Sequence, residues 1–306
     1  MKLSANASAV IPVVMLPLGL WLGWRAFRGQ SLAGILAAVA ELPAPHLAAA
    51  IACTVASYAC LTGFDALGVR YAGRGLPYRK VALTSFVSLS IGHTVGVAVL
   101  SSGALRYRLY TRFGLRGRDV VRIVLFSGVT VGLGLTVLGG LALLFRPGLA
   151  EELMALGIGT GGARALGAAL VAAGPAYVLA AWRIRRPLTL RGHEFRLPTP
   201  GIAAAQLAVG TVNFAFVAGA LHQLLAAAAP YADIVAAYVL GIAAGLVSHV
   251  PGGLGVLEYV ISSLIGREAV IAAPISFRIL YFLLPLLAGS TLLLATELWR
   301  AGRKRR

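Results

Sequence analysis

Charged side chains are scarce in this sequence, and acidic ones are the scarcest. Asp, Glu, Lys and Arg make up 12% of the 306 residues, hydrophobic residues make up 59%, and the mean hydropathy is +0.86. A soluble domain carries about twice this share of charge. The composition therefore excludes a soluble globular protein and predicts a chain that crosses a membrane several times.

Cysteines and known catalytic motifs are also nearly absent. The two cysteines, Cys53 and Cys60, lie about two helical turns apart on one apolar segment, too far apart to bond. The five histidines lack the paired short spacings of a zinc site, and no His-Glu-x-x-His, Cys-x-x-Cys, Walker-type or Gly-x-Ser-x-Gly motif occurs. We therefore expect no metal, no other cofactor and no catalytic residue.

Basic residues, by contrast, outnumber acidic residues by 27 to 10. They form short clusters between apolar segments, where membrane proteins carry the charges that set their orientation. Orientation and contact with anionic lipid explain these clusters better than nucleic acid does. We expect the membrane, and no nucleic acid, among the partners.

Eight apolar segments are long enough to enter a membrane: 7–24, 45–66, 82–105, 120–145, 163–182, 200–228, 234–265 and 269–299. If all eight cross, the 26 basic residues other than Arg278 divide 14 to 12 between the two sides. If 82–105 and 234–265 instead enter and return on one side, the division becomes 21 to five. The positive-inside rule favours the second arrangement, with both termini cytoplasmic in a bacterial inner membrane.

The two returning segments have the composition of helical hairpins. Residues 82–105 contain eight Ser, Thr and His residues and three glycines, so two arms of about ten residues, about 15 Å each, would span half of a ~30 Å core. In 234–265 the apolar run breaks at Pro251, Gly252 and Gly253, and Gly255 follows. Backbone groups freed by such a break persist at membrane depth only inside protein or beside water.

The order of segments is the same in the two halves of the chain, but the second half starts on the opposite side. The sequence thus predicts an all-α membrane protein with six crossings and two opposed re-entrant hairpins, arranged as an inverted repeat. We expect residues 1–150 to form the first repeat and 151–306 the second, within one membrane domain and without a soluble synthase domain. Glycine spacings such as Gly132 to Gly140 could pack helices within one chain or in a homo-oligomer.

Two charges at membrane depth, Glu258 and Arg278, are the strongest candidates for a site. Each charge costs about 2.5–3.5 kcal/mol on insertion scales, so we expect the two to be paired, hydrated or both. The pair would either hold the fold together or grip a charged substrate.

Other polar residues have a structural and a functional interpretation. Asp65 either pairs with nearby Arg70 or joins the site, and Arg106 either reaches the interface or joins the site. Asp233 could simply cap the second hairpin. His93 and His249, beside the two hairpin tips, are either satisfied core groups or proton carriers. Near the inner end of the last segment, we expect Arg300 to neutralise Glu297.

Three motifs resemble the membrane region of the lysylphosphatidylglycerol synthase family, the multiple peptide resistance factors, and its stand-alone relatives. They are TGFDALGVR, GHTVGVAVLSSGALRYRLYTRFGL, and HVPGGLGVLEYV followed by ISFRILYFLLP. The resemblance implies a flippase-like part that moves an aminoacylated phospholipid, without the domain that transfers the amino acid. It also implies that Asp65, Arg106, Glu258 and Arg278 are the important polar residues, with Asp233 less securely matched.

These observations predict a lipid translocase that accepts an anionic or aminoacylated phospholipid headgroup between the hairpins. Arg106 and Arg278 would meet phosphate, and Asp65 and Glu258 would meet a cationic group or hold the arginines. The main alternative is a membrane scaffold for an enzyme that makes a lipid or a polyisoprenoid-linked glycan. An enzyme acting within the membrane is disfavoured, because no nucleophile with an adjacent base is recognisable.

Overall fold

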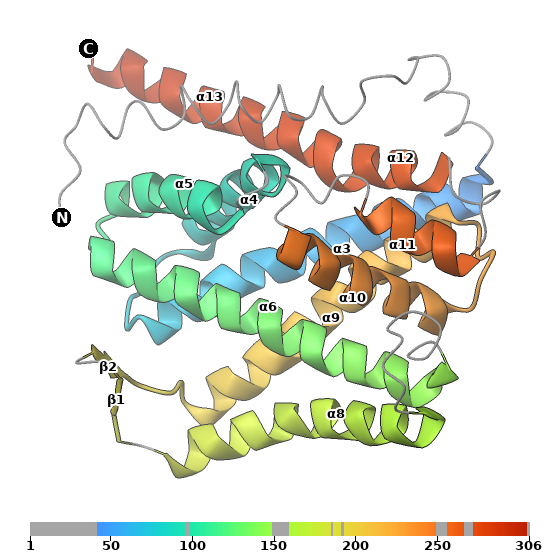
Figure 1. The fold of residues 1–306 in the computed structure, drawn as a ribbon. Helices are drawn as coiled ribbons and strands as arrows, with labels where there is room; N and C mark the ends of the chain where they lie inside the picture. The colour runs from blue at the N-terminus through green and yellow to red at the C-terminus, as the bar shows by residue number, and fades with distance from the viewer. Residues whose placement is uncertain are drawn as a thin grey trace.

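The computed structural model describes residues 42–95, 98–148, 159–184, 186–190, 193–248, 256–265 and 272–304 (Figure 1). The described chain is almost entirely helical. Five stretches are long and apolar enough to cross a membrane: α3 (Ala44–Tyr71), α6 (Gly117–Phe145), α8 (Gly159–Arg183), α9 (Pro200–Leu224) and the C-terminal stretch Ala273–Trp299. At about 1.5 Å per residue each exceeds the ~30 Å hydrocarbon core. They coincide with five of the six predicted crossings, and the sixth, residues 7–24, lies outside the described residues.

Helices α3 and α9 run antiparallel through the centre of the bundle. His46 Nδ1 lies 2.8 Å from Gln223 Oε1 at one end of this contact, and Ser57 donates to Asn213 Oδ1 over 2.8 Å near its middle. Ser57 and Asn213 are equally far along the chain from the first residues of their helices, Ala44 and Pro200. The two helices therefore cross at equivalent points.

Glycines bring α6 close to its neighbours. A Cβ built on Gly140 would lie 2.8 Å from the carbonyl oxygen of Gly167 on α8, closer than any side chain tolerates. A Cβ on Gly132 would meet nothing within 4 Å. The glycine spacing could pack helices within one chain or between chains, and Gly140 makes a contact within one chain.

The two predicted hairpins correspond to two pairs of shorter helices. Helices α4 (Tyr78–Val95) and α5 (Ala98–Arg112) pack closely against each other at Gly92 and Ser102. A Cβ built on Gly92 would lie only 2.7 Å from the Cβ of Ser102. Helices α10 (Tyr231–Ser248) and α11 (Val256–Ile265) pack together at Gly241 and Leu257 in the same manner.

The arms of the first pair are longer than predicted. Helix α4 has 18 residues and α5 has 15, whereas the sequence predicted arms of about ten. The polar turns Tyr78–Lys80 and Arg106–Arg112 are helical too, and a hydropathy window counts neither of them with the apolar run. Packing of these turns against α3, α6 and α13 supplies the stability that hydropathy does not register.

The last membrane-length stretch is broken by a π turn. Helix α12 (Ala272–Arg278) leads into the π-helical segment η3 (Ile279–Leu283), and α13 (Leu284–Lys304) follows. Pro285 has no N–H for the carbonyl of Tyr281 four positions earlier. The hydroxyl of Tyr58 donates to that carbonyl instead, over 3.1 Å, and joins the break to α3.

A small β-ribbon lies between α8 and α9, where the sequence predicted only a basic connection. Strand β1 (Leu188–Leu190) pairs antiparallel with β2 (His193–Phe195), with Leu188 opposite Phe195. The hydroxyl of Tyr71, the last residue of α3, donates to the carbonyl of Arg196 over 2.7 Å. The ribbon is therefore held at the end of the bundle where α3 ends and α6 begins (Figure 1).

Candidate functional site

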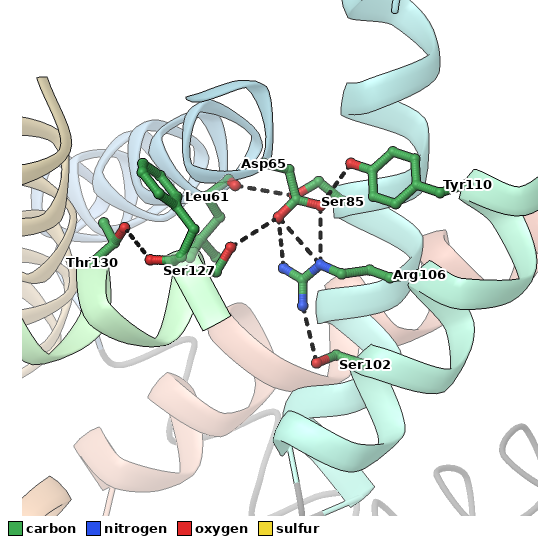
Figure 2. A network of polar contacts seen from close by, with 9 residues as sticks. Leu61, Asp65, Ser85, Ser102, Arg106, Tyr110, Ser127 and Thr130 are labelled. Atoms are coloured by element: carbon green, nitrogen blue, oxygen red, sulfur yellow. Dashed lines mark hydrogen bonds and ion pairs between the residues drawn. The ribbon is translucent and has the colours of Figure 1, made fainter. Parts of the chain in front are cut away.

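A buried ion pair between Asp65 and Arg106 lies where α3, α5 and α6 meet (Figure 2). Arg106 donates from Nη2 to Oδ1 of Asp65 over 2.7 Å and from Nε to Oδ2 over 3.0 Å. Residue exposures are 0% for Asp65 and 3% for Arg106. The fork of the guanidinium thus meets both carboxylate oxygens, which is the strongest geometry for such a pair.

Three hydroxyl groups complete this pair. Tyr110 donates to Oδ2 of Asp65 over 2.8 Å, Ser127 lies 3.4 Å from Oδ1, and Ser102 accepts from Nη1 of Arg106 over 3.1 Å. Ser102, Arg106 and Tyr110 are spaced by four residues, so they lie on one face of α5. That face is turned toward Asp65 on α3 (Figure 2).

Four further hydrogen bonds near this cluster join side chains of one helix to side chains or backbone carbonyls of another. Ser85 on α4 donates to the carbonyl of Leu61 over 3.0 Å. Gln206 on α9 donates to the hydroxyl of Thr130 and to the carbonyl of Phe126 over 2.9 and 3.0 Å, and it accepts from Tyr177 on α8. Gln206 therefore links α9 to α6 and α8 close to Ser127, which belongs to the Asp65 cluster.

The partner of Asp65 is a correction to the simpler sequence interpretation. Arg70 is exposed, and the guanidinium on Asp65 belongs to Arg106, which is 41 residues away along the chain. A side chain five positions further along a helix points to a different face, so Arg70 is directed away from Asp65. Sequence proximity alone could not identify Arg106 as the partner.

In this conformation Asp65 and Arg106 satisfy each other. Each charge without the other would lose its main compensation in a buried setting. A ligand that separates them would have to supply an anion for Arg106 and a cation for Asp65 at the same time. The arrangement can therefore exchange partners with a zwitterionic or mixed-charge group, and it disfavours a simple cation or anion.

Several predicted residues of the second hairpin lie outside what the structure describes. These are His249, Pro251, Gly252, Gly253 and Gly255. Glu258 lies in the described helix α11, but its side chain is not described, so its pairing with Arg278 stays a prediction. Arg278 is half-buried and is the last residue of α12, directly before the π turn. Single-turn π segments occur often at functional positions in proteins.

Asp233 is in a different position from the predicted cap. It lies inside the first turn of α10, which begins at Tyr231, and its Oδ1 lies 2.6 Å from Nε of Arg146 at the end of α6. His93 lies in the last turn of α4 and is half-buried. His93 lies close enough to Arg106 of the Asp65 cluster for the two side chains to interact electrostatically.

Glu297 contacts two arginines of another helix. Arg108 and Arg112 of α5 hold it, with Nη2 of Arg108 3.1 Å from Oε2. The two arginines are four residues apart and so point the same way, toward α13. The side chain of Arg300, its predicted partner, is not described, so that pairing stays a prediction.

A second polar cluster was missed from the sequence. Asn213 accepts from Ser57, and the Ser57 hydroxyl lies 2.7 Å from the hydroxyl of Tyr281 in the π turn. All three are buried. Asn213 within the apolar run 200–228 and Pro285 within 269–299 are the sequence signals that could have located this cluster.

No metal cluster of His, Cys, Asp or Glu side chains occurs within the described ranges. Five membrane-length apolar helices around buried polar contacts define a multi-pass membrane protein.

No protein-family model matches the chain. "Inner membrane protein YbhN" of Escherichia coli (strain K12) is 32% identical over 247 residues, which cover 79% of this chain and 77% of YbhN. "Uncharacterized protein slr0712" of Synechocystis sp. is 29% identical over 278 residues, which cover 89% and 86% of the two chains. The chain belongs to the family of the inner membrane protein YbhN, and it is a multi-pass inner membrane protein.

Proposed function

We propose that this protein is a lipid translocase that moves a phospholipid headgroup between leaflets. The observation that carries the proposal is the buried pair of Asp65 and Arg106, which sits between a membrane-length helix and the hairpin α4–α5. Charged pairs this deep in an apolar bundle are rare and usually mark a path for a polar substrate.

Partner exchange gives this pair a role in transport. A headgroup with a phosphate and an ammonium group would meet Arg106 with the phosphate and Asp65 with the ammonium. Each buried charge then keeps an opposite charge throughout, so the pair can open without leaving either one unpaired. An aminoacylated phospholipid carries both groups, as does any zwitterionic phospholipid. Glu258 and Arg278 would repeat the arrangement at the second hairpin.

Packing partners support the proposed inverted repeat of residues 1–150 and 151–306. Helices α3 and α9, which hold equivalent places in the two halves, pack against each other at equivalent positions. The first hairpin packs on the last crossing of the second half through α4 and α13, and the second hairpin packs on the last crossing of the first half through α10 and α6. Such exchange between halves is typical of transporters in which hairpins meet near the membrane midplane.

The proposed orientation places both termini and the basic end of the bundle in the cytoplasm. Exposed basic residues gather where α3 and α8 end and α6 begins: Arg70, Arg79, Lys80, Arg116, Arg118, Arg122, Arg183, Arg186 and Arg196. The positive-inside rule assigns such an end to the cytoplasm. In this orientation the hairpin α4–α5 enters from the cytoplasm and α10–α11 from the opposite side.

The test is headgroup accessibility in proteoliposomes that contain only this protein and a phospholipid with a fluorescent or aminoacylated headgroup. A membrane-impermeant quencher reports whether inner-leaflet lipid reaches the outer leaflet. We expect translocation by the wild type, loss of translocation in Arg106→Gln, and no loss in Arg70→Gln, an exposed arginine on the same end.

Two outcomes would contradict the translocase proposal. If the wild type moves no phospholipid of the panel while an enzyme of lipid or glycan synthesis co-purifies with it from membranes, the scaffold function is correct. If the purified protein instead changes the headgroup covalently, it is an enzyme.

A further inference from the structure

Two groups of ion pairs connect the halves of the chain at opposite ends of the bundle. At the basic end, Glu297 on α13 contacts Arg108 and Arg112 on α5. At the other end, Arg146 directly after α6 contacts Asp233 in the first turn of α10. Figure 1 places the end of α13 with the end of α5, and the end of α6 at the other end of the bundle.

Both groups join the same kinds of element. In each, one partner belongs to a hairpin and the other to the last membrane-length helix of the opposite half. Their polarity is reversed, since the hairpin supplies the arginines at the basic end and the aspartate at the other end. Asp119 also contacts Arg74 and Arg118 at the basic end, but these pairs lie within the first half.

Each of these groups joins a partly exposed charge to a buried one, whereas both members of the central pair are buried. The side chains are 30% exposed for Glu297, 21% for Arg112 and 46% for Arg146, but only 8% for Arg108 and 12% for Asp233. Those of Asp65 and Arg106 are 0% and 4% exposed. When one of the outer pairs separates, water rehydrates its exposed member, so opening costs less than it does for a fully buried pair. The central pair loses its compensation unless a ligand replaces it.

We propose that these ion pairs are the two latches of an alternating-access cycle, one on each side of the headgroup site. The inner latch is Glu297 with Arg108 and Arg112, and the outer latch is Asp233 with Arg146. Release of the inner latch frees the first hairpin from α13 and opens the basic end. Release of the outer latch frees the second hairpin from α6 and opens the opposite end. Both latches are closed in this structure.

This inference rests on the proposed function, because it assigns a gate to each side of the same site. It makes Asp233 a gating residue that need not touch the substrate. It also gives a role to the contacts that Glu297 and Asp233 make with arginines of the other half.

Cysteine labelling tests the latches without any transport measurement. Cys53 and Cys60 are replaced by alanine, and a single reporter is placed at a buried position: Ser88→Cys on α4 or Ala237→Cys on α10, both 0% exposed in the native protein. A membrane-impermeant maleimide is added to cells or to inside-out vesicles. Labelling rate then measures access from each side.

We expect Glu297→Gln to raise labelling of Ser88→Cys several-fold from the basic side alone, and Asp233→Asn to raise labelling of Ala237→Cys several-fold from the opposite side alone. Arg74→Gln is the matched control, because it also breaks a pair between a partly exposed arginine and a buried carboxylate at the basic end, but one that does not join the halves, and it should change neither rate. Charge reversal should restore closure: Glu297→Arg with Arg108→Glu and Arg112→Glu at one end, Asp233→Arg with Arg146→Asp at the other.

Three results overturn the proposal. The labelling rates do not change, or each substitution raises labelling from both sides together, or charge reversal fails to restore the native rate. The proposed function is tested separately. If labelling responds as expected but the protein moves no phospholipid, the latches serve a different cargo. If the protein transports lipid but labelling is not side-specific, only the latch proposal is rejected.

Discussion

Asp65 is surrounded by donors that come from two other helices. Arg106 and Tyr110 reach it from α5 and Ser127 from α6, so one carboxylate on α3 fixes the position of both neighbours. From the sequence, Asp65 and Arg106 could have either a structural or a site role, and the family resemblance implied that both are important. Their partnership was not visible, since it depends on how three helices pack.

Removing the charge of Asp65 tests its structural role. We expect Asp65→Asn to lower the free energy of unfolding by about 3–5 kcal/mol, because Arg106 then stays buried without a carboxylate. Arg70→Gln should change it by less than about 0.5 kcal/mol, as for other exposed positions. Detergent-titrated unfolding of the purified protein measures both, and equal effects would contradict the assigned pairing.

The hydroxyl of Tyr58 has a role that its sequence context did not show. It donates to the Tyr281 carbonyl, which Pro285 leaves without its helical donor. Tyr58→Phe should therefore destabilise the protein by about 1–3 kcal/mol, the penalty of a buried unsatisfied carbonyl.

The matched control is Tyr231→Phe, which also removes a phenol bonded to a backbone carbonyl, that of Ala215. Tyr231 is 41% exposed, so water can replace its bond. Unfolding measured under the same conditions should show a clearly smaller loss for this variant. If the two losses match, the carbonyl of Tyr281 does not depend on Tyr58.

At the level of the element, hydropathy located the helices well and their ends and contacts poorly. The predicted hairpins 82–105 and 234–265 correspond to α4–α5 and α10–α11, but α4 and α5 extend into polar turns that pack on other helices. The sequence did not predict the π turn, which ends just before Pro285 and is bonded to Tyr58 on a distant helix. The two arginines that hold Glu297 come from α5, a contact that depends on how α5 and α13 lie in the bundle.

Close glycine contacts between elements make a sharp test of helix packing. Gly140→Ala places a methyl group against the backbone of Gly167 on α8, so we expect a loss of about 1–3 kcal/mol from overpacking. Gly132→Ala meets open space on the same helix and should be neutral or stabilising by up to about 1 kcal/mol. Unfolding measured for the two variants under the same conditions tests this prediction. Equal losses in the free energy of unfolding would contradict the α6–α8 contact.

At the scale of the whole molecule, the count of basic residues predicted which end of the bundle would be basic. The structure gathers exposed arginines at that end from segments far apart in the sequence. Charge counting does not depend on contacts, which is why it works from sequence alone. The packing of α4 on α13 and of α10 on α6 does depend on contacts, so charge counting could not predict it.

Side-specific labelling tests whether α4–α5 returns to the side from which it came. Single cysteines at Gly75→Cys, before α4, and Arg118→Cys, at the start of α6, replace exposed residues and should label from the cytoplasm. Gly148→Cys, after α6, should label from the opposite side. Labelling of the first two from opposite sides would mean that the segment crosses the membrane an odd number of times.

The central claim is that Asp65 and Arg106 accept a headgroup, and exchange of the two residues tests it most directly. Asp65→Arg with Arg106→Asp keeps a buried ion pair while moving each charge to the other helix. In proteoliposomes we predict that wild type brings inner-leaflet phospholipid within reach of an impermeant quencher, and that the exchanged variant, folded as judged by its unfolding midpoint, does not. Quenching at the wild-type rate in the exchanged variant, or none in wild type, would contradict the account.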